Sequence, residues 1–239
     1  GEGGGIRQAV AAIAGRMTTK MTVDSRKNGV YASYPPARVI AMSTDFWNSR
    51  YAEPGYAYGT EPNAFLASQK KYLKPGGKAL AVADGEGRNG VWLAQQGLDV
   101  LSVDASEVGL RKTQELAADR GVAIRTEKVD LITWQWPVQK HDVVVAIYVH
   151  FPPEVRARMH RCMFEALKPG GILILEAFTP AQLNYKSGGP PVAEMLYSAD
   201  MLRIDFAAGE ILFIEEAIAE LAEGKYHRGP GAGVRLVLR

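Results

Sequence analysis

Short apolar runs alternate with amphipathic stretches from residue 79 onward. Runs typical of buried strands cover residues 79–83, 98–103, about 123–129, 142–148 and 172–176. Between them, apolar residues recur at helical spacing, as Val155, Met159 and Met163 do after Pro152-Pro153. Strands that alternate with helices of 10–15 residues predict a parallel sheet that is covered by helices on both faces.

The C-terminal third has a different pattern. Residues 211–214 and 234–238 are typical of strands, and we expect a short helical stretch and the turn Gly229-Pro230-Gly231 between them. Because so little chain separates these two strands, they are predicted to pair antiparallel. The predicted fold class is therefore α/β, a doubly wound, mostly parallel sheet of seven strands with an antiparallel C-terminal strand.

Charge and glycine content separate the first 41 residues from the rest of the chain. Residues 1–41 open with Gly-Glu-Gly-Gly-Gly and hold six Lys/Arg against two acids, whereas residues 42–239 hold 22 against 24. We interpret 1–41 as a tag-like or accessory extension and 42–239 as one folded domain. The slightly acidic domain has no Lys/Arg cluster that would follow a nucleic-acid backbone, so no nucleic-acid partner is expected.

Cysteine and apolar content narrow the class of protein further. Cys162 is the single cysteine, which excludes an intramolecular disulfide and a multi-cysteine metal site. No stretch approaches the roughly 20 continuous apolar residues of a membrane span. We expect a soluble, cytoplasmic protein that uses no metal and works as a monomer or a homodimer.

Candidate ligand-binding residues follow the first three strands. The first strand enters Gly85-x-Gly87 and then a helix, which offers backbone N–H groups to an anionic group, although such a turn also occurs for purely structural reasons. Asp104 ends the second strand, where a carboxylate accepts ribose hydroxyls or caps a helix. Asp130, after the third strand, is either an acceptor for the amine of an adenine or a solvated loop acid.

Taken in order, these motifs carry a family resemblance. The series Gly85-Glu86-Gly87-Arg88-Asn89, Val103-Asp104, Val129-Asp130-Leu131, His141-Asp142 and Leu167-Lys168-Pro169-Gly170-Gly171 resembles the class I S-adenosylmethionine-dependent methyltransferases, which have a Rossmann-like fold. The likeness covers about residues 43–239. Gly87-Arg88-Asn89 and Tyr226-His227-Arg228 are most similar to the bacterial tellurite-resistance and thiopurine-type group.

The resemblance implies S-adenosylmethionine as cofactor and assigns roles by position. The residues implied to bind it are Asp84, Gly85, Gly87 and Arg88 near the aminocarboxylate, Asp104 at the ribose, Ala105 and Leu131 beside the adenine, Asp130 at its amine, and Ile147 at the sulfonium. The family usually has an acid where Ala81 stands and often a glycine where Ala83 stands. The missing acid leaves open how tightly the methionine end is held.

Aromatic residues before the first strand are candidates for a lid. Aromatic faces stabilise cations such as a methyl sulfonium by about 0.5–2 kcal/mol each. Trp47, Tyr51 and Tyr58 are our candidates for covering the cofactor, as the family's N-terminal aromatics do. The alternative is that these side chains anchor the N-terminal extension on the core.

Three residues are candidates for the chemistry of methyl transfer, which needs a base only where the nucleophile arrives protonated. His150 follows the fourth strand, and His227-Arg228 resembles a His-Arg pair of the tellurite methyltransferases. Arg228 would hold an anionic substrate, and His227 would accept a proton or orient the substrate. The alternatives are a structural histidine and a solvated pair of charges. The irregular segment 178–197, with Tyr185 and Tyr197, is expected to be a second lid at the acceptor pocket.

The predicted function is methyl transfer to a small-molecule acceptor, such as a thiol or a chalcogen oxyanion. Two alternatives stay open. A NAD-dependent oxidoreductase is disfavoured because residues 83–88 lack the third glycine of the dinucleotide fingerprint. A non-catalytic partner subunit with the same fold is suggested by Ala81 and Ala83.

Overall fold

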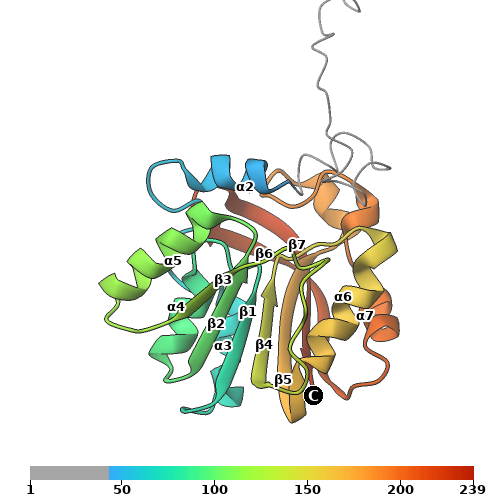
Figure 1. Cartoon of the computed structure of the whole chain (residues 1–239). Helices are drawn as coiled ribbons and strands as arrows, with labels where there is room; N and C mark the ends of the chain where they lie inside the picture. The colour runs from blue at the N-terminus through green and yellow to red at the C-terminus, as the bar shows by residue number, and fades with distance from the viewer. Residues whose placement is uncertain (1–42) are drawn as a thin grey trace, which may run out of the picture. The chain divides into compact units, whose positions relative to one another are not determined.

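The computed structural model describes residues 43–239, which form a seven-stranded sheet with helices packed on it (Figure 1). The expected extension at 1–41 lies outside the described residues. The strands are β1 (Lys78–Val82), β2 (Asp99–Asp104), β3 (Arg125–Lys128), β4 (His141–Ile147), β5 (Leu167–Phe178), β6 (Ile211–Glu223) and β7 (His227–Leu238).

The strand order is β3-β2-β1-β4-β5-β7-β6. Strands β1 to β5 are mutually parallel, whereas β7 runs antiparallel to both β5 and β6. This arrangement confirms the predicted α/β class and the antiparallel C-terminal strand. The order reverses between β1 and β4, and in such sheets ligands bind outside the carboxyl ends of the strands at this switch point.

The helices follow the predicted alternation. They are α2 (Thr44–Tyr51), α3 (Ala64–Ser68), α4 (Arg88–Gln95), α5 (Glu107–Asp119), α6 (Pro153–Glu165) and α7 (Ala199–Asp205). Single 3-10 turns cover Lys70–Tyr72, Pro180–Asn184 and Ala193–Met195. Side chains set the ends of several helices, since Ser43, Asn63, Ser106 and Ser198 each accept a hydrogen bond from a backbone N–H of the first turn.

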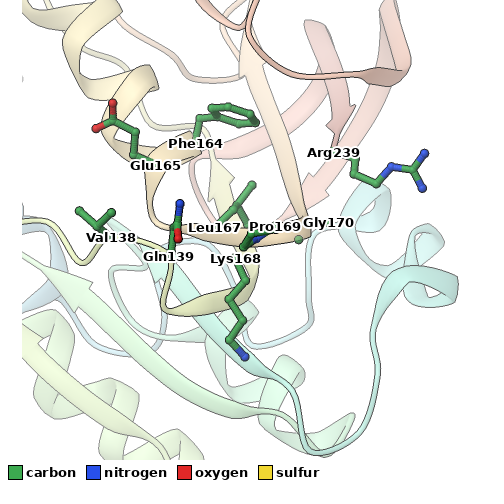
Figure 2. Close-up of a pocket in the computed structure, with 10 residues that line it drawn as sticks. Val138, Gln139, Phe164, Glu165, Leu167, Lys168, Pro169, Gly170 and Arg239 are labelled. Atoms are coloured by element: carbon green, nitrogen blue, oxygen red, sulfur yellow. The ribbon is translucent and has the colours of Figure 1, made fainter.

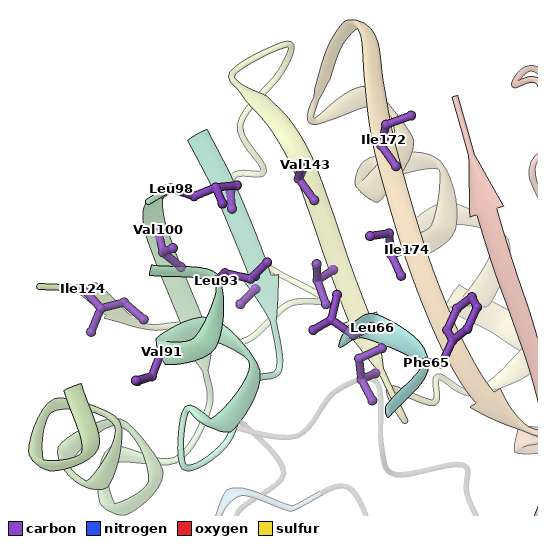
Figure 3. Packing of buried hydrophobic residues seen from close by; sticks show 14 of the residues in the cluster. Phe65, Leu66, Val91, Leu93, Leu98, Val100, Ile124, Val143, Ile172 and Ile174 are labelled. Carbon is purple, nitrogen blue, oxygen red and sulfur yellow. The ribbon is translucent and has the colours of Figure 1, made fainter. Parts of the chain in front are cut away.

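One face of the sheet buries its apolar residues against α3, α4 and α5. Figure 3 shows Leu66 of α3 and Leu93 of α4 on the same side as Val143 and Ile174 of the strands. Alternate strand residues such as Leu173 are also buried and face the opposite side. There α6 packs on β5 and α7 on β6. Burial on both faces explains why the central strands are continuous apolar runs.

The C-terminal hairpin differs from the sequence prediction. No helix separates the last two strands, because β6 extends to Glu223 and β7 begins at His227, joined by a turn at residues 224–226. Gly229-Pro230-Gly231, expected to form the turn, pairs with β6 inside β7. The helix-forming residues of 215–223 adopt a strand because pairing along all of β7 outweighs their weak intrinsic propensity.

Candidate functional site

Two non-glycine residues with left-handed backbone mark the switch point. Ala83 follows β1 with φ of 48°, and Tyr148 follows β4 with φ of 57°. Such conformations are uncommon outside glycine and concentrate where a binding site constrains the chain. The value at Ala83 also explains why the resembled family often has glycine there. Ala83 and Tyr148 therefore begin the two loops at the carboxyl ends of β1 and β4, where a ligand is expected to bind.

The glycine turn after β1 is bonded to the carboxylate that ends β2. The Gly85 N–H donates to Asp104 Oδ2 at 2.9 Å, and the Ser106 N–H donates to Asp104 Oδ1 at 2.8 Å. Gly85 and Gly87 have φ of 60° and 85°, so glycine is required for this turn. Burial raises the pKa of Asp104 to about 6. A carboxylate accepts about four hydrogen bonds, so both oxygens keep capacity for a ligand's hydroxyl groups.

The two charged residues expected at the aminocarboxylate end are engaged within the protein. Asp84 accepts hydrogen bonds from the Gly90 N–H at 3.0 Å and from Ser102 Oγ at 2.9 Å, and burial raises its pKa to about 7. Arg88 donates to Glu223 Oε2 at 2.9 Å. Asp84 therefore fixes the start of α4, and the N–H groups of the turn are the remaining candidates for an anionic group.

Helix α2 lies at the upper end of the sheet (Figure 1), and its residue Tyr51 packs on the glycine turn. The Tyr51 hydroxyl oxygen lies 2.5 Å from the position that a Cβ on Gly85 would occupy, so only glycine leaves room for the buried Tyr51 ring. Trp47 stacks on Tyr51 with ring centroids 5.5 Å apart. Asn48 accepts a hydrogen bond from Ser106 Oγ at 2.7 Å. Two of the three expected lid aromatics therefore lie together.

The third expected lid residue, Tyr58, belongs to a different group. Its ring centroid lies 4.5 Å from that of His227, and its hydroxyl accepts a hydrogen bond from Arg50 at 3.0 Å. The same guanidinium lies over the Tyr226 ring at 4.1 Å. Tyr58 thus connects the segment after α2 to the β6–β7 hairpin, which includes a backbone bond from Lys225 to Ala57.

The residues expected around an adenine lie after β2, β3 and β4. Ala105 is half-buried next to Asp104, and Ile147 is buried at the end of β4. Leu131 is half-buried, with its carbonyl accepting a hydrogen bond from Trp136 Nε1 at 2.9 Å. Asp130 is exposed and accepts a hydrogen bond from the Ile132 N–H at 3.0 Å. Their roles at a nucleoside stay predictions.

His150 has a structural role in place of the expected catalytic one. Its Nδ1 lies 2.8 Å from the Met195 carbonyl, and its Nε2 accepts a hydrogen bond from the Phe178 N–H at 3.2 Å. Burial lowers its pKa to about 4. Both ring nitrogens are therefore used by the backbone of the second expected lid, and no lone pair is free to take a proton.

His227 and Arg228, the expected catalytic pair, lie at the start of β7 with their side chains on opposite faces of the strand. His227 is buried, with its ring in contact with Tyr58, Tyr148 and Phe178. Arg228 is exposed and donates to the Gly224 carbonyl at 2.7 Å. Adjacent strand residues point to opposite faces, which is the reason for this separation. Arg228 is thus placed away from His227, contrary to their expected joint action on one substrate.

Segment 178–197 packs against His227 through its glycines. A Cβ on Gly188 would lie 2.5 Å from His227 Cδ2 and 2.8 Å from Nε2. Gln182 holds this segment by donating to Ser187 Oγ and to the Gly188 carbonyl, both at 3.0 Å. Tyr197 is buried, and its hydroxyl accepts a hydrogen bond from the Phe151 N–H at 2.6 Å, whereas Tyr185 is half-buried. Tyr197 is thus a buried structural residue at the end of this segment, and the role of the segment as a lid stays a prediction.

A hollow of about 240 Å³ lies at the other end of the sheet (Figure 2). Its walls come from the segment before β4 and from the start of β5, with Gln139, Lys168 and Gly170 among the residues that line it. Lys168 there pairs with Asp142 at 2.7 Å. Because ligands of doubly wound sheets bind at the carboxyl ends of the strands, we do not assign the cofactor to this hollow.

Four polar residues near the site were missed by the sequence analysis, three of them buried and one, Glu223, half-buried. Glu86 accepts a hydrogen bond from the Ala57 N–H at 2.7 Å and pairs with Lys112 at 2.8 Å. Asn63, Glu176 and Glu223 form a network described below. Glu86 lies in the glycine turn, so its place in the sequence could have identified it as a site residue. The other three are paired with residues from distant segments, and no local sequence pattern predicts such pairs.

The described residues show neither a metal site nor a membrane-spanning helix. Residues 43–239 contain no group of three or more His, Cys, Asp or Glu side chains arranged to hold a metal ion. None of the helices in this range has the length and apolar character that a bilayer crossing requires.

Comparisons with known proteins agree on one kind of domain. A family model described as a methyltransferase domain matches residues 79–171. A ribosomal protein L11 methyltransferase of Caldicellulosiruptor bescii is 34% identical over 130 residues, which are 51% of this chain and 40% of that protein. Thiocyanate methyltransferase 1 of Brassica oleracea is 29% identical over 57% of this chain and 62% of its own length. The chain thus spans less than two thirds of these curated relatives.

Solved structures share the fold. The crystal structure of TehB from Haemophilus influenzae superposes with a TM-score of 0.60 and 20% identity, covering 82% of this chain and 66% of that one. At this identity the similarity establishes the architecture alone.

Proposed function

We propose that this chain, of which residues 79–171 match a family model described as a methyltransferase domain, is a class I methyltransferase that transfers a methyl group from S-adenosylmethionine to a small-molecule acceptor. The observation that carries the proposal is the contact between Gly85 and Asp104. A glycine turn and a buried carboxylate meet at the switch point, 2.9 Å apart, with acceptor capacity left on both carboxylate oxygens.

The residues at this edge fit the cofactor. Asp104 would hold the ribose hydroxyls, because its carboxylate accepts backbone hydrogen bonds from Gly85, Ser106 and Ala105 and can accept about four in all. The N–H groups of the turn with Gly85 and Gly87 would face the carboxylate of the methionine end. Ala105, Leu131 and Asp130 would contact the adenine, and Trp47 and Tyr51 of α2 would exclude water from above.

When bound, S-adenosylmethionine supplies an electrophilic methyl group on a positively charged sulfur. The protein's contribution is to align the acceptor with that methyl group and to remove the acceptor's proton where it has one. Tyr148, Phe178 and His227 pack against one another beyond β4, and we place the acceptor beside this aromatic group. Among the histidines expected to act, His227 is the candidate base, since both nitrogens of His150 are bonded to backbone groups.

A small acceptor is supported by charge and by one relative. Residues 42–239 carry 22 Lys/Arg against 24 acids, with no basic cluster that would track a polyanion. The Brassica relative is named for thiocyanate, a small anion. The Caldicellulosiruptor relative is named for a ribosomal protein, so a protein acceptor is the outcome that would contradict this part of the proposal.

Calorimetry with S-adenosylhomocysteine tests whether the chain binds the proposed cofactor, and a turnover assay tests whether it methylates a small-molecule acceptor. We expect saturable binding of S-adenosylhomocysteine and none of NAD⁺. We also expect formation of methylated product from at least one member of a panel of thiols, selenite and tellurite. Absence of binding would reject the methyltransferase assignment. Binding without turnover on the panel, together with methylation of protein in a cell extract, would reject the small-molecule acceptor.

A further inference from the structure

A buried network of charges joins α3, α4, β5, β6 and β7 beneath His227. Glu223 accepts hydrogen bonds from Arg88 at 2.9 Å and from Asn63 at 3.0 Å. Asn63 also donates to Glu176 at 2.6 Å, and Glu176 accepts from Arg235 at 2.7 Å. Two carboxylates and two guanidinium groups thus balance one another. Charge-assisted bonds of this kind fix the positions of their partners in a buried site.

Glu223 also determines the tautomer of His227. The Nδ1 atom lies 3.1 Å from Glu223 Oε2. An ionised carboxylate only accepts hydrogen bonds, so Nδ1 carries the proton and Nε2 of the neutral ring carries the lone pair. The hydrogen bonds from His227 and Arg88 outweigh the effect of burial and lower the pKa of Glu223 to about 2, so it stays ionised. Among the hydrogen bonds described for residues 43–239, the His227 side chain takes part through Nδ1 only, and its Nε2 lies 2.8 Å from the position that a Cβ on Gly188 would occupy.

The surroundings of the His227 ring are mainly aromatic. Tyr58, Tyr148 and Phe178 contact the His227 ring with centroids 4.5, 4.7 and 5.3 Å away. The cations in this network, Arg88 and Arg235, are each paired with a carboxylate. Arg50, the cation next to Tyr58, is already engaged by the Tyr58 hydroxyl and the Tyr226 ring. Aromatic faces and a neutral base therefore suit a thiol better than an oxyanion.

We propose that Glu223 is a positioning residue that holds His227 ready to deprotonate a neutral, soft acceptor of the thiol class. The inference rests on the proposed methyl transfer and specifies its acceptor. The thiol S–H proton moves to His227 Nε2. The sulfur's electron pair forms a new bond to the methyl carbon as the bond from that carbon to the sulfonium sulfur breaks. The breaking bond's electron pair stays on the cofactor sulfur, and the imidazolium releases its proton to solvent.

The groups that face His227 set its protonation. Glu223 of β6 and Glu176 of β5 favour the protonated ring, and Arg88 of α4 opposes it. Tyr58 and Tyr148 contact it as neutral rings, because burial raises the pKa of each hydroxyl. Burial of the imidazole itself has the largest effect and lowers the pKa of His227. The free ring is therefore neutral at pH 7 and able to accept a proton.

The test compares Glu223→Gln with Glu176→Gln in the whole chain. Both substitutions remove one carboxylate from the same network and leave one arginine unpaired, but only Glu223 contacts His227. Each variant is assayed at pH 8 with 2-mercaptoethanol, which is mostly protonated there, and with thiophenol, which is already ionised. Long-range ¹⁵N–¹H correlation spectra of the imidazoles report the His227 tautomer without cofactor.

We expect Glu223→Gln to lower kcat for 2-mercaptoethanol by about 10- to 100-fold, within the usual range for general base catalysis, and for thiophenol by less than about threefold. Glu176→Gln should lower both to a similar extent. In the spectra, native His227 should show a protonated Nδ1, with this preference weakened in Glu223→Gln.

An Nε2-protonated native ring would overturn the proposal. So would equal losses on the two thiols in Glu223→Gln. These outcomes are separate from failure of the proposed function, which would appear as absence of S-adenosylhomocysteine binding to the native chain while the spectra still report the tautomer.

Discussion

Replacement of Asp104 by Asn probes the cofactor site with the smallest change in shape. The side chain keeps its volume and one acceptor oxygen but replaces the other oxygen by an NH₂ donor. In the native protein both oxygens accept backbone N–H groups, from Gly85 at 2.9 Å and from Ser106 at 2.8 Å. The variant therefore leaves one of these N–H groups facing a donor, and it removes the charge that would bind two ribose hydroxyls.

The expected loss follows from the bonds removed. A hydrogen bond to a charged group contributes about 1.5–3 kcal/mol. Because Asn retains one neutral acceptor, we expect S-adenosylhomocysteine to bind about 2–4 kcal/mol more weakly. This difference corresponds to a Kd about 30- to 1,000-fold higher. The unsatisfied backbone donor should lower the free energy of unfolding by a further, separate amount of about 1–3 kcal/mol.

Calorimetry gives the Kd, and urea unfolding gives the stability. Ser106→Ala is the matched control, because it removes the N-cap bond to the Gly109 N–H and the bond to Asn48 but keeps the carboxylate. It should cost about 0.5–2 kcal/mol of stability and change the Kd by less than about threefold. If folded Asp104→Asn binds S-adenosylhomocysteine as tightly as the native protein, Asp104 does not hold the ribose and our reasoning is wrong.

Three further predictions concern the lid, pH and the buried network. Gly188→Ala places a Cβ 2.5 Å from His227 Cδ2 at a φ of 118°, so turnover should fall more than about tenfold while S-adenosylhomocysteine affinity, from calorimetry, changes little. With a pKa of about 6 for Asp104, that affinity should be about tenfold weaker at pH 5 than at pH 7, since the protonated acid loses acceptor capacity; a flat profile would refute this. Asn63→Ala leaves Glu176 and Glu223 each without one bond and should cost about 2–4 kcal/mol in urea unfolding, against less than about 1 kcal/mol for exposed Asn184→Ala.

The central sheet and the Gly85–Asp104 contact could be predicted because their signals are local. A strand leading into Gly85 and a carboxylate at the end of the next strand meet wherever two parallel strands are neighbours, so spacing along the chain determines their position in space. The pairing of β1 with β2 places Val82 opposite Val103, one residue before Asp104.

The acceptor side could not be predicted in the same way. The contact of Glu223 with His227 depends on a long hairpin whose first strand has the composition of a helix, and the sequence prediction placed a helix there. His150 was a reasonable catalytic candidate from its place after β4, but its partners, Met195 and Phe178, come from the lid and from β5. Side-chain roles that depend on contacts between distant segments leave no periodic signal.

A crystal structure of the chain with S-adenosylhomocysteine tests the central claim most directly. We expect both ribose hydroxyls within hydrogen-bond distance of the Asp104 carboxylate, the amino-acid end on the turn at Gly85, and the sulfur on the side of Tyr148 and His227. Ligand density with the sugar away from Asp104, or in the hollow beside Lys168 at the other end of the sheet, would contradict this account.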